Sequence, residues 1–181
     1  MKKTISLFQR NYEGDRLVRN EVTPGAEWVI AGEGVATRKF DGTCCLIRNG
    51  VLFKRYEVKK GGIPPINFEP ANEVDEITGK QQGWIPVGDG PEDQWHRDAF
   101  TTLERKSDGT YELVGPKVQG NPEGYDFHFL IRHGEWIIAD APRDYDGLKL
   151  FLGSAGIEGI VWHHPDGKMV KIKTRDFGIK K

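Results

Sequence analysis

The dipeptide Asn49-Gly50 separates two apolar runs, 43–48 and 51–56. Asparagine and glycine accept the two positive φ angles of a type I′ turn, so this pattern predicts a tight β-hairpin. Two further hairpins are predicted from apolar runs on each side of a turn: 101–106 with 110–114, and 157–162 with 168–174. A chain with three such hairpins is expected to build antiparallel sheets.

Glycine makes up 23 of the 181 residues, nearly twice the average share of roughly 7%. Most of these glycines fall at turns, as a β-rich fold requires. One helix is predicted over 144–152, with Asp144 or Asp146 as its N-cap and Gly153 as its end. The segment of about 62–100 is interpreted as an acidic loop insertion with one short helix. We therefore predict an α+β fold, dominated by antiparallel sheets, in one domain over residues 1–181.

Composition argues against several classes of protein. The mean hydropathy is −0.56 and no long apolar run is present, so no transmembrane helix is predicted. The basic start of the chain is followed by no apolar stretch of the kind that a secretory signal carries. Its two cysteines, Cys44 and Cys45, are adjacent, which argues against a disulfide scaffold or a zinc finger and predicts small packing residues. An intracellular, cytoplasmic protein is expected.

The formal net charge of −1 conceals an uneven distribution. Residues 38–60 and 168–181 each carry a net charge of +5, and residues 69–98 carry −6. Near-neutrality argues against a nucleic-acid partner, but two basic segments could converge on one anionic ligand. Alternatively, each is an edge strand whose lysines face water.

Three lysines of the two basic segments are candidates for chemistry on an anion. Lys39 precedes Asp41 and Gly42 at the entrance of a predicted strand, where it is either a nucleophile or part of an ordinary turn. Lys171 and Lys173 are two residues apart and therefore share one face of their predicted strand, with apolar residues on the other face. That strand either lines an anionic cleft or lies at a solvent-facing edge.

Two carboxylates interrupt apolar strand patterns. Glu112 and Glu158 each stand where an apolar residue is expected, which suggests a carboxylate that binds a metal, a cation or a ligand hydroxyl. For Glu112, an outward-facing strand position is the alternative. His163 and His164 adjoin Pro165 and are interpreted as parts of a solvated turn rather than as metal ligands.

Taken in order, these segments resemble the motif set of the covalent nucleotidyltransferases, which comprise ATP-dependent RNA ligases, DNA ligases and mRNA capping enzymes. The resemblance runs from Lys39 to Lys173 through five motifs: Lys39-x-Asp41-Gly42, Lys54-Arg55-Tyr56, Glu112-Leu113-x-Gly115, Glu158-Gly159-Ile160-Val161 and Lys171-Ile172-Lys173. Residues 54–61, 83–88 and 128–134 are most similar to small 5′-3′ RNA ligases. The resemblance implies an ATP-grasp-like adenylation domain. Because only eight residues follow Lys173, no oligonucleotide-binding barrel is expected.

The resemblance implies catalytic roles for the charged residues. Lys39 would attack the α-phosphate of ATP and hold AMP, and Asp41 would orient Lys39 or share a hydrated metal. Lys171 and Lys173 would hold the phosphates. Glu158 would bind Mg²⁺, or Mn²⁺ in its place.

It also implies how AMP is held. Arg55 rather than Lys54 would contact AMP or the 3′-hydroxyl end, because the two point to opposite faces of a strand. Glu112 would accept a hydrogen bond from a ribose hydroxyl. Phe129 is selected from three aromatic candidates, which include Phe127 and Trp136, as the residue that stacks on adenine.

The resemblance therefore predicts an ATP-dependent RNA ligase that joins 5′-phosphate and 3′-hydroxyl RNA ends in RNA repair. ATP, Mg²⁺ and RNA ends are the expected co-substrate, cofactor and partners, and a partner chain is an open route to end recognition. The alternatives are a DNA ligase, a GTP-dependent capping-type nucleotidyltransferase, or a non-catalytic RNA-binding module.

Overall fold

A computed structural model describes residues 4–180. Within these residues the chain forms two compact units, one over 41–133 and the other over 4–40 together with 134–180. The expectation of a single domain over 1–181 stays a prediction. Among the described residues, no helix has both the length and the apolar character needed to cross a membrane.

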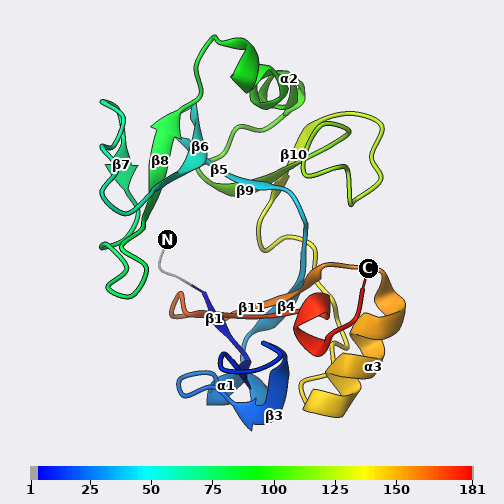
Figure 1. Ribbon diagram of the computed structural model, residues 1–181. Helices are drawn as coiled ribbons and strands as arrows, with labels where there is room; N and C mark the ends of the chain where they lie inside the picture. Colours follow the sequence, from blue (N-terminus) through cyan, green and yellow to red (C-terminus); the bar gives the residue numbers. More distant parts are fainter. Residues whose placement is uncertain (1–3, 181) are drawn as a thin grey trace. The chain divides into compact units, whose positions relative to one another are not determined.

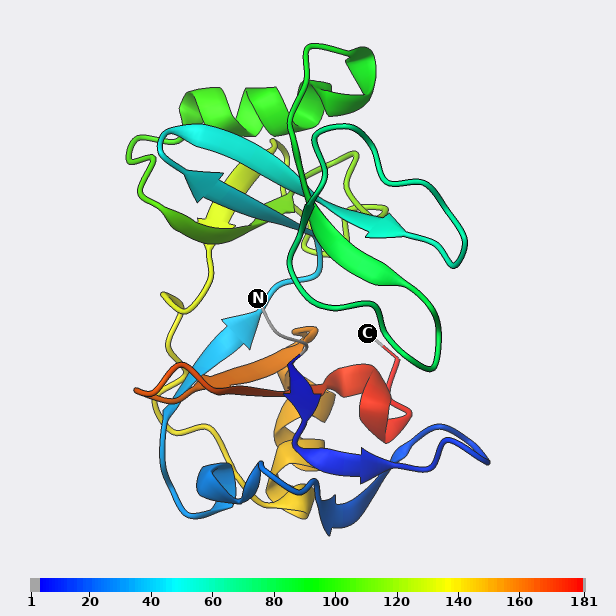
Figure 2. The ribbon, with the colours of Figure 1, turned by 90° about the vertical axis from the view of Figure 1, so that its left-hand side faces the viewer.

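The 41–133 unit contains an antiparallel sheet in which the described strands run in the order β10-β9-β5-β6-β8-β7 (Figure 1). The strand bounds are β5 Thr43–Arg48, β6 Val51–Val58, β7 Glu69–Pro70, β8 Gln81–Pro86, β9 Gly109–Val114 and β10 Phe129–Arg132. A 3₁₀ turn, η1 (Pro91–Asp93), leads into helix α2 (Gln94–Thr102). Ala99 of α2 is fully buried against Cys45, Tyr111 and other apolar residues of the sheet, so α2 covers one of its faces (Figure 2).

The hairpin predicted at Asn49-Gly50 is confirmed. Arg48 and Val51 are directly paired, and the two turn residues have φ angles of 50° and 74°. Both angles lie in the left-handed region, where asparagine and glycine are tolerated better than other residues.

The hairpin predicted from 101–106 to 110–114 is wrong. Residues 94–102 form α2, and β9 pairs with β5 and β10 instead. Burial of Ala99 and two hydrogen bonds from Arg97 to the carbonyl oxygens of Gly88 and Gly90 hold this segment as a helix. The interpretation of 62–100 as a loop insertion with one short helix is corrected in part: α2 agrees with the expected helix, but strands β7 and β8 also lie in this segment.

The second unit contains a sheet with the described order β1-β12-β11-β4 and a separate pair, β2-β3. Its elements are β1 Ile5–Ser6, β2 Phe8–Arg10, β3 Val18–Val22, α1 Glu27–Ile30, β4 Val35–Lys39, α3 Tyr145–Ala155, β11 Gly159–His163, β12 Met169–Lys173 and the 3₁₀ turn η2 Thr174–Phe177. The hairpin predicted from 157–162 to 168–174 is confirmed as β11–β12. β1 pairs with β12 in parallel and the other described pairs are antiparallel, so the predicted α+β class is confirmed with one parallel pair.

The predicted helix starts as expected but ends later. The side chain of Asp144 caps α3 by accepting a hydrogen bond from the backbone N–H of Gly147. Gly153 does not end the helix, which continues to Ala155 and stops at Gly156, whose φ is 64°. The left-handed conformation that closes a helix requires glycine at position 156, whereas Gly153 adopts ordinary helical geometry.

The core of this unit determines which face of its sheet is left for polar residues. Ile160, Val170 and Ile172 are at most 1% exposed and pack in the same cluster as Leu148 and Leu152 of α3. Because side chains alternate along a strand, Lys171 and Lys173 lie on the opposite face.

Candidate functional site

A cluster of lysines lies on the polar face of the β12-β11-β4 sheet. Gly159 of β11 pairs with Lys39 of β4 on one side and with Lys173 of β12 on the other. Directly paired residues project to the same face, so the two lysines flank Gly159. A Cβ atom on Gly159 would lie 2.1 Å from the carbonyl oxygen of Ile172. Position 159 therefore requires glycine, and no side chain separates the two lysines.

Glu158 bridges this lysine pair. Its Oε2 accepts a hydrogen bond from Nζ of Lys39 at 2.5 Å, and its Oε1 accepts one from Nζ of Lys173 at 2.6 Å. Burial raises the pKa of Glu158, but the charge of Lys39 and the hydrogen bonds from both lysines outweigh this effect and lower the pKa. Glu158 is therefore a carboxylate held ionised among cations.

Lys171 adds a third cation to the same face. It pairs with Val161 of β11 and with Ser6 of β1, so β12 is an interior strand and the alternative of a solvent-facing edge strand is wrong. Burial, together with the charges of Lys173 and Lys39, lowers the pKa of Lys171 to about 8. Burial and neighbouring cations disfavour the charged form of Lys171, and a bound anion would stabilise that form.

In the 41–133 unit, Arg55 and Glu112 occupy one face of the sheet. Leu46 pairs with Phe53 on one side and with Thr110 on the other. Arg55 and Glu112 each follow two residues later and therefore project to the same face as these three residues. This face is opposite to the one that α2 covers.

Lys54 and Arg55 lie on opposite faces of β6, as predicted. Lys54 forms an ion pair with Asp93, which is 2% exposed at the start of α2. The Nε–H of Arg55 donates to Oε1 of Gln82 at 2.9 Å, and its guanidinium lies 4.8 Å from the centroid of the Trp84 ring. Arg55 is thus the member of the pair that shares a face with Glu112.

Glu112 is buried, and each of its carboxylate oxygens has a hydrogen-bonding partner. Its Oε1 accepts a hydrogen bond from the backbone N–H of Gly42 at 3.1 Å, and its Oε2 lies 2.8 Å from Nε2 of His133. The outward-facing alternative for Glu112 is therefore wrong, since only 8% of the residue is exposed. His133 is absent from the site predicted from the sequence. It lies in the segment 128–134 that is similar to small RNA ligases, but outside the five motifs that suggest site residues.

The remaining predicted residues have simpler surroundings. The backbone N–H of Asp41 donates to Oε1 of Glu123 at 2.9 Å. Phe129 packs edge-on against Tyr125, with ring centroids 4.5 Å apart, while Phe127 is 64% exposed. Trp136 and Phe40 both belong to the other unit, where their rings pack edge-on. The role of Asp41 and the choice of Phe129 for adenine stay predictions.

The two histidines at the β11–β12 turn differ from each other. His163 belongs to β11, and its Nε2 lies 3.0 Å from Oγ1 of Thr37, so its assignment to a solvated turn is wrong. His164 lies in the turn beside Glu33 and Asp166. Hydrogen bonding to Glu33 raises the pKa of His164.

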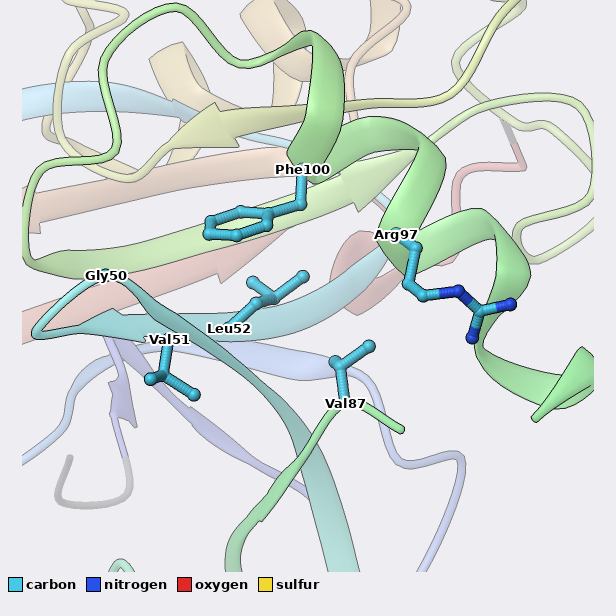
Figure 3. A pocket seen from close by; sticks show the side chains of 6 residues that line it. All are labelled: Gly50, Val51, Leu52, Val87, Arg97 and Phe100. Atoms are coloured by element: carbon cyan, nitrogen blue, oxygen red, sulfur yellow. The ribbon is translucent and has the colours of Figure 1, made fainter. Parts of the chain in front are cut away.

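A pocket of about 240 Å³ lies between α2 and the tip of the β5–β6 hairpin (Figure 3). It is lined by Gly50, Val51, Leu52, Val87, Arg97 and Phe100. None of the predicted site residues lines it. Its one charged lining residue, Arg97, is already hydrogen-bonded to Gly88 and Gly90.

Comparison with known proteins gives a consistent result. The model of the family "RNA ligase 1" matches residues 96–181. The chain is similar to RNA ligases. RNA ligase 1 of Rattus norvegicus is 25% identical over 219 residues, covering 80% of this chain and 67% of the relative. RNA ligase 1 of Pongo abelii is 29% identical over 152 residues, covering 61% and 47%. The same protein of Danio rerio is 25% identical over 219 residues, covering 80% and 67%.

These findings confirm the resemblance to RNA ligases seen in the motifs. The region matched by the family model contains the carboxylates Glu112 and Glu158 and the lysines Lys171 and Lys173. Lys39 lies before that region.

Proposed function

We propose that this protein is an ATP-dependent RNA ligase that joins a 5′-phosphate to a 3′-hydroxyl through a covalent AMP adduct on Lys39. The observation that carries the proposal is the pair of hydrogen bonds from Lys39 and Lys173 to Glu158. A lysine held at a fixed position beside two further cations and one carboxylate suits attack on a polyanionic substrate.

In the first step, Nζ of Lys39 attacks the α-phosphorus of ATP and loses a proton. The new bond joins nitrogen to phosphorus, and the bond from the α-phosphorus to the pyrophosphate oxygen breaks. Lys171 and Lys173 neutralise the phosphate oxygens and the departing pyrophosphate. Glu158 orients Nζ of Lys39 through their hydrogen bond.

Two further transfers complete the reaction. An oxygen of the RNA 5′-phosphate attacks the adduct, the nitrogen–phosphorus bond breaks, and Lys39 regains its proton. The 3′-hydroxyl of a second RNA end then attacks the activated 5′-phosphate, loses its proton and expels AMP. Both transfers pass through anionic phosphates, so the same lysines serve in each of them.

Glu158 is the residue that would hold a divalent cation on the lysine face. Both of its oxygens already accept hydrogen bonds from lysines, which fits Mg²⁺ held through water and substrate phosphates rather than in an all-protein cage. When bound, the ion supplies positive charge next to the phosphate oxygens. Asp41 is a second candidate carboxylate.

The resemblance assigns the remaining contacts with AMP. Glu112 accepts from a ribose hydroxyl, Arg55 contacts the phosphate or the incoming RNA end, and Phe129 stacks on adenine. These assignments are part of the proposal. The burial of Glu112 and the shared face of Glu112 and Arg55 support them.

The test is incubation of the purified chain with ATP or GTP labelled at the α-phosphate. Label from ATP is expected on the wild type and on a Lys149→Ala control, in which an exposed lysine of α3 is removed. Lys39→Ala should remove the label. Label from GTP alone would indicate a capping-type enzyme, and nucleotide binding without any covalent label would indicate a non-catalytic module.

The polynucleotide is identified in a second assay. Nicked and single-stranded RNA substrates with 5′-phosphate and 3′-hydroxyl ends are compared with DNA substrates of the same sequence. Sealing of RNA in preference to DNA is expected, and the reverse preference would indicate a DNA ligase.

A further inference from the structure

Three side chains from separate segments of the 41–133 unit converge on one point. They are Cys44 of β5, Glu112 of β9 and His133, which follows β10. One ligand atom of each lies within 4.8 Å of the other two. Cys44 and Glu112 are directly paired across β5 and β9, so the sheet itself places a sulfur and a carboxylate on the same face.

Hydrogen bonds orient two of these groups. The backbone N–H of Gly42 holds Oε1 of Glu112, which directs Oε2 toward His133. Nδ1 of His133 lies 3.0 Å from Oγ1 of Thr110, while Nε2 faces Glu112. A histidine that binds a metal generally bonds through its second ring nitrogen to a nearby oxygen, which fixes the ring and the tautomer. Thr110 occupies that position for His133.

We propose that Cys44, Glu112 and His133 form a binding site for Zn²⁺. A thiolate, an imidazole and a carboxylate are the ligand types that Zn²⁺ takes in proteins, and three of them leave the fourth position for water. With metal–ligand bonds of ~2.0–2.3 Å, ligand atoms around one tetrahedral ion lie roughly 3.3–3.8 Å apart. The observed cluster reaches this spacing by small side-chain movements.

The ion replaces an existing hydrogen bond. Nε2 of His133 and Oε2 of Glu112, now 2.8 Å apart, would each bind the metal instead of each other. The proton that they share would pass to Nδ1 of His133, which then donates to Oγ1 of Thr110. The proton of the Cys44 thiol passes to the solvent as the sulfur–metal bond forms. Cys44 and His133 are partly exposed, so the ion has access from solvent.

The neighbouring cysteine supplies a matched control. Cys45 is fully buried on the opposite face of β5, and its Sγ donates to the carbonyl oxygen of Thr43. Removing the sulfur of Cys45 changes the cysteine content equally but leaves the cluster intact.

The experiment is a titration of the whole chain with Co²⁺, a spectroscopic substitute for Zn²⁺, without nucleotide. A charge-transfer band from thiolate to Co²⁺ at one equivalent is expected, and Zn²⁺ should displace it. Cys44→Ala should abolish the band. His133→Ala and Glu112→Gln should weaken Co²⁺ binding at least about tenfold. Cys45→Ala should keep the band and the Co²⁺ affinity of the wild type. Thermal unfolding of each variant verifies that it is folded.

Absence of the thiolate band in the wild type would overturn the proposal, as would a band that survives in Cys44→Ala. Glu112 is also the ribose residue of the proposed function. Because the titration contains no nucleotide and measures no ligation, its result is independent of whether the chain is a ligase.

Discussion

Lys39 and Glu158, which are 119 residues apart in the chain, are joined by a hydrogen bond of 2.5 Å. The same carboxylate accepts from Lys173. One acid thus positions two lysines of the proposed phosphate site, and the consequences of losing it are measurable.

Glu158→Gln is expected to lower the rate of AMP transfer to Lys39 by about 10²–10³-fold, since a neutral amide no longer neutralises or orients the two lysines. Single-turnover labelling with ATP measures the effect. Glu13→Gln, at an exposed position, should leave the rate unchanged. An unaltered rate in a folded Glu158→Gln variant would contradict the assigned role.

Binding of ATP should weaken as pH rises through about 8. The pKa of Lys171 is lowered to about 8, so the free protein loses this cation above that pH, and affinity should fall by no more than tenfold per pH unit. Lys171→Arg should abolish the dependence, because arginine stays charged. Calorimetric titration with ATP from pH 7 to 9.5 measures it; a parallel decline in both proteins would mean that another group is responsible.

The same lysine predicts how stability depends on pH. Its pKa is about 8 in the folded chain and near 10.5 unfolded, so between these values the unfolded state binds more protons. The free energy of unfolding should therefore gain a contribution that rises with pH in this window. Lys171→Met should be more stable than the wild type near pH 7, and the difference should shrink toward pH 10. Urea unfolding at both pH values compares the two proteins.

Two glycines near the end of α3 should respond in opposite directions to alanine. Gly153 is helical, and a Cβ there would meet only Cδ1 of Ile179 at 3.6 Å, so Gly153→Ala should stabilise by about 0.5–1 kcal/mol. Gly156 has a φ of 64°, and Gly156→Ala should destabilise by about 1 kcal/mol. Chemical denaturation measures both, and equal effects would contradict the observed helix end.

Local patterns predicted local structure well. The Asn49-Gly50 turn and the alternation around Lys171 depend on residues adjacent in the chain, and both are confirmed. The predicted helix end at Gly153 and the predicted strand over 101–106 are wrong, because glycines and apolar runs occur in helices as well as in turns and strands. There, burial of Ala99 and the left-handed geometry of Gly156 decided the outcome.

Much of the candidate site is visible in the motifs, but its contacts are not. The lysines and carboxylates could be named from their order along the chain. His133 lies in the segment 128–134 that is similar to small RNA ligases, but in none of the five motifs that suggest site residues. Its place beside Glu112 depends on the pairing of β9 with β10, which no spacing in the sequence encodes.

The sequence by itself determined which residues alternate, where the tightest turn lies and which charges are available, because these follow from neighbours a few residues apart. Only the tertiary structure decided that Gly159 lies between two lysines and that Cys44 meets Glu112 and His133. Both arrangements depend on strand register, which is set by burying apolar side chains such as Ile160 and Tyr111 on one face of each sheet. That choice of face leaves the lysines on the opposite face of one sheet, and Cys44 and Glu112 on the opposite face of the other.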